Sequence, residues 1–163
     1  MQKSKIKSQS FNSRRFKGFT LIEILITVCI IAILSGIILT SLSDFRASSD
    51  INGSKDEILT TLQEARSLTL SSKNDSNYGV QFSVSSVTLF KGPIYTADDP
   101  SNKVHFLPQG AEISSISLTG GASGVLFSRL TGAVSASGTI TIRAKAKPEK
   151  TRSITISSSG LIE

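Results

Sequence analysis

Glu23 is the residue of this sequence whose chemistry most needs an explanation, because it is the single charge in the apolar run from Phe19 to Leu39. A carboxylate in hydrocarbon costs about 2.5–3.5 kcal/mol on insertion scales and marks a functional site by default. Gly18 stands directly before the run and after a cationic segment. Two interpretations follow: Glu23 has a cationic partner, or it lies at a membrane interface and is solvated by headgroups.

The apolar run has the length of a membrane span. Its 21 residues, at ~1.5 Å each, would form a helix of about 31 Å, close to the thickness of a bilayer core. The run is too long for a secretory signal peptide, and Cys29 follows Ile26-Thr27-Val28 rather than the small residues that precede a lipoprotein cysteine. We therefore expect a transmembrane helix.

The positive charge of the chain is concentrated before this run. The net charge of the whole chain is +6. Residues 19–163 carry 12 basic and 12 acidic groups, and residues 1–18 carry six basic groups and no acidic one: Lys3, Lys5, Lys7, Arg14, Arg15 and Lys17. This asymmetry predicts a cytoplasmic N-terminus and an extracytoplasmic remainder.

After the run, apolar residues recur with helical spacing. Ile51, Ile58, Leu62 and Ala65 lie on one stripe together with Thr69, which predicts one long helix from Phe19 to about Ser71 whose second half covers a core. We expect this helix to be weakened near Asn52-Gly53 and stopped by residues 73–77.

From Tyr78 onward the apolar period becomes two, which is typical of strands. The expected strands are few and short, about six or seven, around residues 78–84, 87–90, 104–107, 113–118, 125–127, 139–144 and 154–156. The last two should form a hairpin with its turn at Pro148-Glu149. The predicted fold class is α+β, with a long N-terminal helix packed on an antiparallel sheet. The expected organisation is a leader over residues 1–18, a transmembrane half-helix over 19–40, and an extracytoplasmic domain over 41–163.

The junction from Arg14 to Glu23 resembles the type III signal of type IV pilins and of the pseudopilins of type II secretion. The resemblance implies that a membrane prepilin peptidase cuts after Gly18 and that the new first residue, Phe19, is N-methylated. It also implies that Glu23 sets the axial register of a filament by pairing with the terminal amine of an adjacent subunit. Glycine leaves no side chain to obstruct an extended backbone in the protease cleft. The implied partners are the peptidase, other pilins or pseudopilins and the bacterial inner membrane.

Three later segments are similar to the GspH/FimT group of minor pseudopilins and minor pilins: residues 62–67, 78–82 and 154–160. This similarity implies a minor rather than a bulk subunit of a pilus or pseudopilus. Many pilins have a proline just beyond the apolar core, whereas this chain has Ile38-Leu39-Thr40-Ser41 there. The helix would then be weakest at Gly36 or at Asn52-Gly53.

Two other classes of function compete with a structural subunit. A DNA-binding minor pilin could hold phosphates on the basic hairpin, whose cations are Arg143, Lys145, Lys147, Lys150 and Arg152. The plainer interpretation is a solvated face of an amphipathic or edge strand, in which lysines deter aggregation. An enzyme would need a catalytic constellation, and the sequence offers none that we recognise.

The remaining chemistry-bearing residues indicate no cofactor. The single histidine, His105, cannot supply the three or four ligands that zinc usually takes, and we expect it in a turn or facing solvent. Cys29 cannot form an intrachain disulfide because it is the only cysteine, and we expect it to pack as a small apolar residue.

Cleavage after Gly18 should leave a mature chain of 145 residues (163 − 18) that begins at Phe19. Intact-mass measurement on membrane fractions tests this expectation. Gly18→Arg should block processing, because a long cationic side chain replaces a hydrogen at the scissile position. A full-length chain in cells that contain a competent prepilin peptidase would contradict the prediction.

Overall fold

The computed structural model describes residues 18–163, apart from the side chains of residues 37–41. Of the expected leader it therefore describes Gly18 alone, and residues 1–17 lie outside the described part. The chain divides into two units, one ending at Leu39 and the other spanning Thr40–Glu163.

The long helix is confirmed, as α1, Leu21–Leu70. It begins two residues later than expected, because Thr20 caps its first turn: the backbone N–H of Glu23 donates to Thr20 Oγ1 at 3.3 Å. Asn52 and Gly53, where we expected the helix to be weakened, are both helical. Ile51 and Ser54 on either side of them are buried, and this packing outweighs the low helix propensity of the pair.

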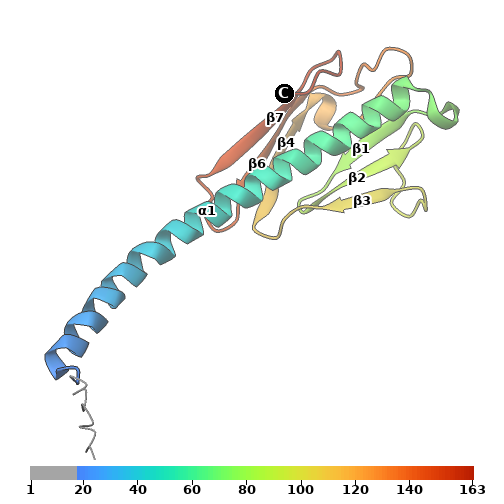
Figure 1. Cartoon of the computed structure of the whole chain (residues 1–163). Coiled ribbons are helices and arrows are strands. Elements are labelled where there is room, and N and C mark those ends of the chain that lie inside the picture. The colour runs from blue at the N-terminus through green and yellow to red at the C-terminus, as the bar shows by residue number, and fades with distance from the viewer. Residues whose placement is uncertain (1–17) are drawn as a thin grey trace, which may run out of the picture. The chain divides into compact units, whose positions relative to one another are not determined.

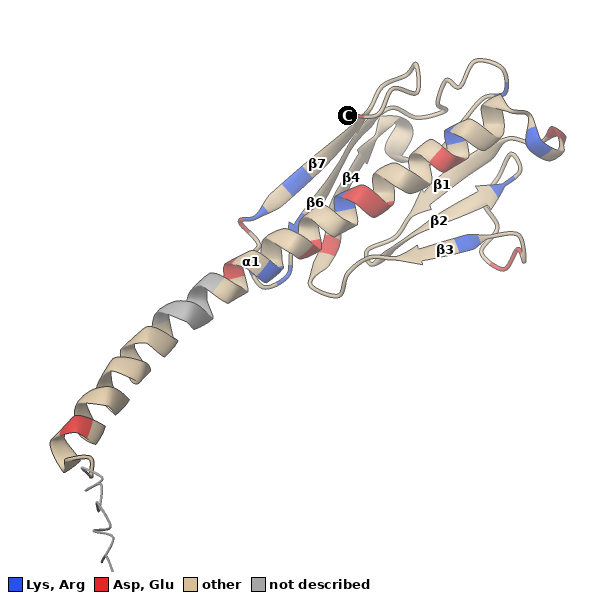
Figure 2. Cartoon of the chain, in the orientation of Figure 1, with Lys and Arg blue, Asp and Glu red and all other residues tan. Residues whose placement is uncertain are grey.

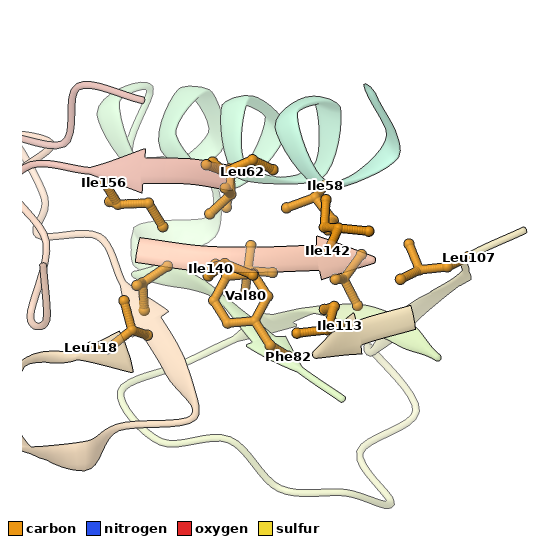
Figure 3. Packing of buried hydrophobic residues seen from close by; sticks show 14 of the residues in the cluster. Ile58, Leu62, Val80, Phe82, Leu107, Ile113, Leu118, Ile140, Ile142 and Ile156 are labelled. Atoms are coloured by element: carbon orange, nitrogen blue, oxygen red, sulfur yellow. The ribbon is translucent and has the colours of Figure 1, made fainter. Parts of the chain in front are cut away.

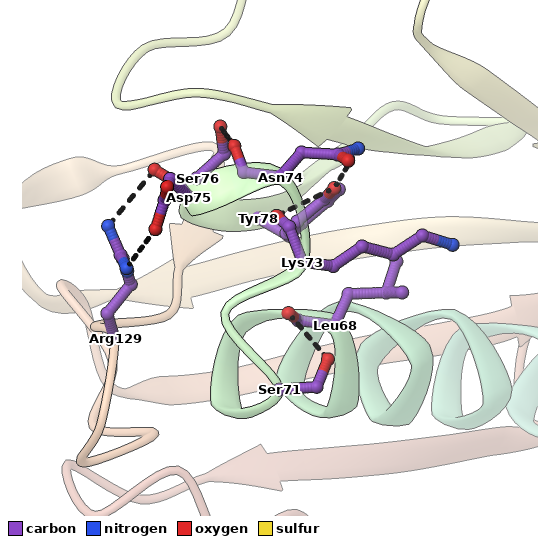
Figure 4. Close-up of polar contacts among 8 residues, drawn as sticks. All are labelled: Leu68, Ser71, Lys73, Asn74, Asp75, Ser76, Tyr78 and Arg129. Carbon is purple, nitrogen blue, oxygen red and sulfur yellow. Dashed lines mark hydrogen bonds and ion pairs between the residues drawn. The ribbon is translucent and has the colours of Figure 1, made fainter.

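The helix ends in a short polar segment that is tied to the strands. A 3₁₀ turn, Lys73–Asp75, follows α1, and Asn74 in it adopts a positive φ of 55°. The hydroxyl of Tyr78 donates to the carbonyl of Lys73 at 3.3 Å, and Arg129 binds the carboxylate of Asp75 at 2.8 Å (Figure 4). Asparagine and aspartate tolerate the left-handed conformation better than most residues, so the predicted stop at residues 73–77 is confirmed.

All seven strands form, but they form two antiparallel sheets rather than the single sheet we expected. The first sheet has the order β3-β2-β1-β5 and the second has the order β4-β6-β7 (Figure 1). The strands of the first sheet are β1, Tyr78–Phe82, β2, Ser86–Lys91, β3, Lys103–Phe106, and β5, Gly124–Leu126. Those of the second are β4, Ala111–Leu118, β6, Gly138–Ala144, and β7, Thr151–Ile156. A second 3₁₀ turn, Thr119–Gly121, separates β4 from β5. Alternation shows which residues of a strand share a face, but it leaves the neighbouring strand undetermined.

The core lies between α1 and both sheets. From Thr40 onward, α1 buries the predicted stripe, with Ile58, Leu62 and Ala65 fully covered. Side chains of both sheets meet it (Figure 3), among them Val80, Phe82, Val87, Leu89, Ile113, Ile140, Ile142, Ile154 and Ile156. The expectation that the stripe covers a core is therefore confirmed.

The β6–β7 hairpin has the predicted pairing, with Ile140 opposite Ile154. Its turn is closed by the backbone N–H of Lys150, which donates to the carbonyl of Lys147 at 2.9 Å. We expected the basic residues on the solvated face of an amphipathic or edge strand. The edge alternative is wrong for β6, which is the central strand of its sheet with β7 at the edge, but Arg143 is exposed between the buried Ile142 and Ala144, as on an amphipathic strand. The sequence pattern could not distinguish the two strands, since both alternate.

Figure 2 colours the acidic residues of α1 and the basic residues of the β6–β7 hairpin, and ion pairs hold the turn of this hairpin to α1. Asp44 accepts hydrogen bonds from the ammonium groups of Lys147 and Lys150, and the Lys150 ammonium also reaches the Asp44 carbonyl and Ser48 Oγ, both at 3.1 Å. The hydrogen bond from Lys147 is the largest cause that holds the pKa of Asp44 below its ordinary value, and the hydrogen bond from Lys150 is the second largest. We call this arrangement the Asp44 clamp.

Replacing Ile58 by alanine should lower the free energy of unfolding by about 2–5 kcal/mol, because a fully buried side chain leaves a cavity between α1 and the sheets. Urea unfolding of the mature chain in detergent, followed by circular dichroism, measures the change. Thr60→Ala is the matched control on the exposed side of α1 and should change the value by less than about 0.5 kcal/mol. Equal losses for both variants would contradict the described core.

Asp44→Asn should release the hairpin turn at neutral pH, because an amide cannot replace the carboxylate that both lysines bind. The expected result is faster hydrogen exchange at the Lys150 amide, relative to its intrinsic rate. Asp98→Asn, an exposed position, is the control.

The wild type should lose the same protection only in acid. A depressed folded-state pKa means that the clamp stabilises the fold above the unfolded value, near 3.8. That stabilisation disappears as the pH falls through the lower folded value. Unchanged exchange in Asp44→Asn, or loss of protection in the wild type already near neutral pH, would show that the clamp does not hold the turn.

Candidate processing and assembly segment

The Gly18–Phe19 bond lies outside regular structure and is uncovered. Both residues precede the first residue of α1, and Phe19 is 78% exposed. A β-carbon built on Gly18 would meet no heavy atom within 4 Å. Nothing in the described part of the chain therefore obstructs access to this bond.

Thr20 is a residue of this segment that our sequence reasoning missed. Its Oγ1 accepts from the Glu23 amide, and its carbonyl accepts from the Ile24 amide at 3.2 Å. A threonine followed three residues later by a glutamate is the sequence signature of a capping box, so the pattern Thr20-Leu21-Ile22-Glu23 could have identified it. The cap fixes Glu23 in the first turn of α1, just after Phe19.

Glu23 itself is exposed on that first turn. Among the described residues, no hydrogen bond or ion pair engages its carboxylate. A negative charge at this position is favoured by the partial positive charge of the helix N-terminus, by about 0.3–1 kcal/mol at an exposed site. That contribution is smaller than the cost of the carboxylate in an apolar environment, so Glu23 still lacks a full partner among residues 18–163.

Around and beyond Glu23, α1 exposes apolar side chains on every side. Leu21, Ile22, Ile24, Leu25, Ile26, Val28, Ile30, Ile31, Ile33 and Leu34 are each at least half exposed. A helix that is apolar all round belongs in a protein core or in a membrane rather than in water. We call the Leu21–Leu34 part of α1 the apolar segment.

Hydroxyl groups in and next to the apolar segment bond to its own backbone. Thr27 Oγ1 donates to the Ile24 carbonyl at 2.8 Å, and Ser35 Oγ donates to the Ile31 carbonyl at 2.7 Å, so neither needs water. Cys29 is exposed in the isolated chain, and its packing as a small apolar residue stays a prediction. In the described residues we find no helix that combines the length and the apolar character needed to cross a membrane.

The basic hairpin does not present five free cations. Arg143 binds Glu112 of β4 at 2.7 Å, and Lys147 and Lys150 belong to the Asp44 clamp. Lys145 is exposed, and so is Arg152, whose guanidinium donates to the Thr151 carbonyl at 3.1 Å. The structure thus brings the hairpin cations together but engages three of them with carboxylates.

The position of His105 differs from the expected one, in a turn or facing solvent. Its Nδ1 lies 2.7 Å from a carboxylate oxygen of Glu57 on α1, so the ring faces the helix rather than solvent or a turn. Within residues 18–163 as described, no group of three or more histidine, cysteine or acidic side chains could hold a metal ion.

Comparison with known proteins gives one match, at the N-terminal segment. Residues 13–39 match the family described as the prokaryotic N-terminal methylation motif. No curated protein and no solved structure matches the chain significantly. The matched residues include Gly18, Phe19 and Glu23 and end where the apolar run ends. The motif supports the type IV pilin superfamily, and with it a structural subunit that is processed as prepilins are and assembles with other pilins.

Proposed function

We propose that this chain is a minor subunit of a type IV pilus or of a type II secretion pseudopilus. In this proposal it is cut after Gly18, methylated at Phe19 and anchored in the bacterial inner membrane by residues 19–40. The N-terminus is cytoplasmic and the domain over 41–163 is extracytoplasmic before assembly. The observation that carries the proposal is the methylation motif on residues 13–39, combined with a helix whose first half exposes apolar side chains all round.

Processing depends on the uncovered Gly18–Phe19 bond. An exposed dipeptide outside regular structure, ahead of a capped helix, can enter a protease cleft without unfolding the helix. The cap at Thr20 keeps α1 intact up to its first residue, Leu21, which is the third residue after the cut. Cleavage converts an amide into a free amine on Phe19, which brings a positive charge close to Glu23.

Assembly moves the apolar segment from lipid to the helices of other subunits. Lipid tails are as apolar as isoleucine and leucine, so this transfer gains little from the hydrophobic effect and depends on packing and polar contacts. The carboxylate of Glu23 supplies such a contact by pairing with the Phe19 amine of a neighbouring subunit. An uncompensated carboxylate costs about 2.5–3.5 kcal/mol in hydrocarbon. The amine of a neighbouring subunit offsets part of this cost, so the pairing favours assembly.

The minor-subunit assignment rests on the similarity of residues 62–67, 78–82 and 154–160 to the GspH/FimT group. DNA binding is not part of the proposal, because Arg143, Lys147 and Lys150 bind carboxylates of their own chain. Only Lys145 and Arg152 would remain for phosphates, and no described ion pair engages either of them.

Glu23→Leu should leave membrane insertion and cleavage intact but prevent efficient incorporation into filaments or complexes with partner pilins. The variant and its partners are co-expressed, assemblies are sheared or extracted, and the recovered subunit is quantified. We expect recovery to fall at least about tenfold, which corresponds to 1.4 kcal/mol.

Thr27→Val is the matched control, because it removes a polar group from the same helix that bonds only to its own backbone. Its recovery should equal that of the wild type. Glu23→Leu recovered at the wild-type amount would mean that Glu23 is solvated at the interface, and the assembly role of this residue would be refuted.

A further inference from the structure

β3 is an edge strand, and its pairing with β2 fixes which of its backbone groups face outward. It lies at one end of the first sheet (Figure 1). The amide of Leu107 donates to the carbonyl of Ser85 at 2.9 Å, and in the same register Val87 lies opposite His105. Antiparallel ladders alternate between pairs that exchange hydrogen bonds and pairs that do not. The backbone groups of His105, two residues from Leu107, therefore point toward β2.

The backbone groups of Val104 and Phe106 point the opposite way, to the free side of the sheet. No described turn, loop or strand on that side donates to their carbonyls or accepts from their amides. They present two donors and two acceptors that repeat every second residue, about 6.6–6.8 Å apart. An extended peptide backbone carries donors and acceptors on the same repeat, so this row fits an additional strand.

The other three edge strands are covered or interrupted by their own chain. Beside β5, the Ser135 amide donates to the Leu126 carbonyl at 2.9 Å, and the Leu126 amide donates to Ser135 Oγ at 3.1 Å. Beside β7, Thr155 exchanges two backbone hydrogen bonds with Glu163, at 2.9 and 3.0 Å. A register shift interrupts β4. In the described part of the chain, β3 has none of these three forms of edge protection.

The side chains of β3 leave its free edge without a guarding charge. Lys103 and His105 face α1, where they bind carboxylates of the helix at 2.8 and 2.7 Å. Val104 and Phe106 stand on the other face, because side chains alternate along a strand, and they are 50% and 76% exposed. An incoming strand would thus meet two apolar side chains, and the charges that often deter pairing at an edge are held by α1.

We propose that β3 accepts an extended segment of a neighbouring pilin subunit as an additional strand of the first sheet. The segment pairs its backbone with Val104 and Phe106 and covers their side chains with apolar residues at alternate positions. A neighbouring subunit is the occupant because the methylation motif indicates assembly with other pilins. The inference rests on the proposed function, which it deepens by naming a contact that uses neither Glu23 nor the apolar segment.

Hydrogen exchange at single amides tests the pairing. It is measured in the mature chain alone in detergent and in complexes with its co-expressed partner pilins. In the isolated chain the amides of Val104 and Phe106 should exchange close to their intrinsic rates, whereas the His105 amide is slowed by its bond to β2. In the complexes the amides of Val104 and Phe106 should slow at least about tenfold.

A proline substitution removes the outward N–H without touching the ladder to β2. Proline is tolerated at edge positions whose N–H faces solvent, so Val104→Pro should keep the cooperative urea unfolding of the isolated chain. Its recovery in sheared or extracted assemblies should fall at least about fivefold. Val104→Thr is the matched control, because it keeps the amide and the β-branched shape, and its recovery should stay within about twofold of wild type.

Two results would overturn the inference: equally fast exchange of both amides in the isolated chain and in the complexes, or wild-type recovery of Val104→Pro. Protection that grows with the concentration of the isolated chain would also overturn it, since a second copy would then be the occupant. Failure of the unsubstituted chain to enter any assembly would instead contradict the proposed function, so the two failures are distinguishable.

Discussion

The globular unit depends on the packing of one helical stripe against two sheets. Each sheet has three or four short strands and an apolar face that would otherwise meet water. Ile58 and Leu62 of α1 contact a core built from both sheets, so this part of α1 joins them into one unit. Two layers around a shared core are the usual solution for such elements. With the only cysteine placed outside this core, packing and not a disulfide must hold it together.

The two parts of α1 differ in the residues that they expose. From residue 42 onward α1 buries one stripe and presents mainly polar groups elsewhere, with Phe45 an exposed exception. The apolar segment has no polar side, and the Thr27 hydroxyl within it donates a hydrogen bond to the helix backbone. Glu23 is the exception, and in the proposed function its partner is the Phe19 amine of a neighbouring subunit, which exists only after processing. The proposed cleavage bond, the helix cap and the charged side chain thus all lie within residues 18–23.

Much of this fold could be predicted from spacing alone, because a helical stripe and alternating strands are local patterns. The ion pairs that hold the β6–β7 turn to α1 join residues that are far apart in the sequence. Lys147 and Asp44 are 103 positions apart, and no periodicity links them, so the basic hairpin was expected to be free. Asn52-Gly53 stays helical because tertiary packing outweighs propensity. The Thr20 cap was available to sequence reasoning through its spacing to the following glutamate.

The central claim is that the apolar segment exchanges lipid for the helices of neighbouring pilins. The most direct measurement is photocrosslinking in cells from a photoreactive amino acid at the position of Ile30, which is 51% exposed in the isolated chain. With partner subunits present, crosslinks should map to the N-terminal helices of other pilins, and without partners they should map to lipid. Crosslinks to lipid alone in both conditions would contradict assembly through this segment.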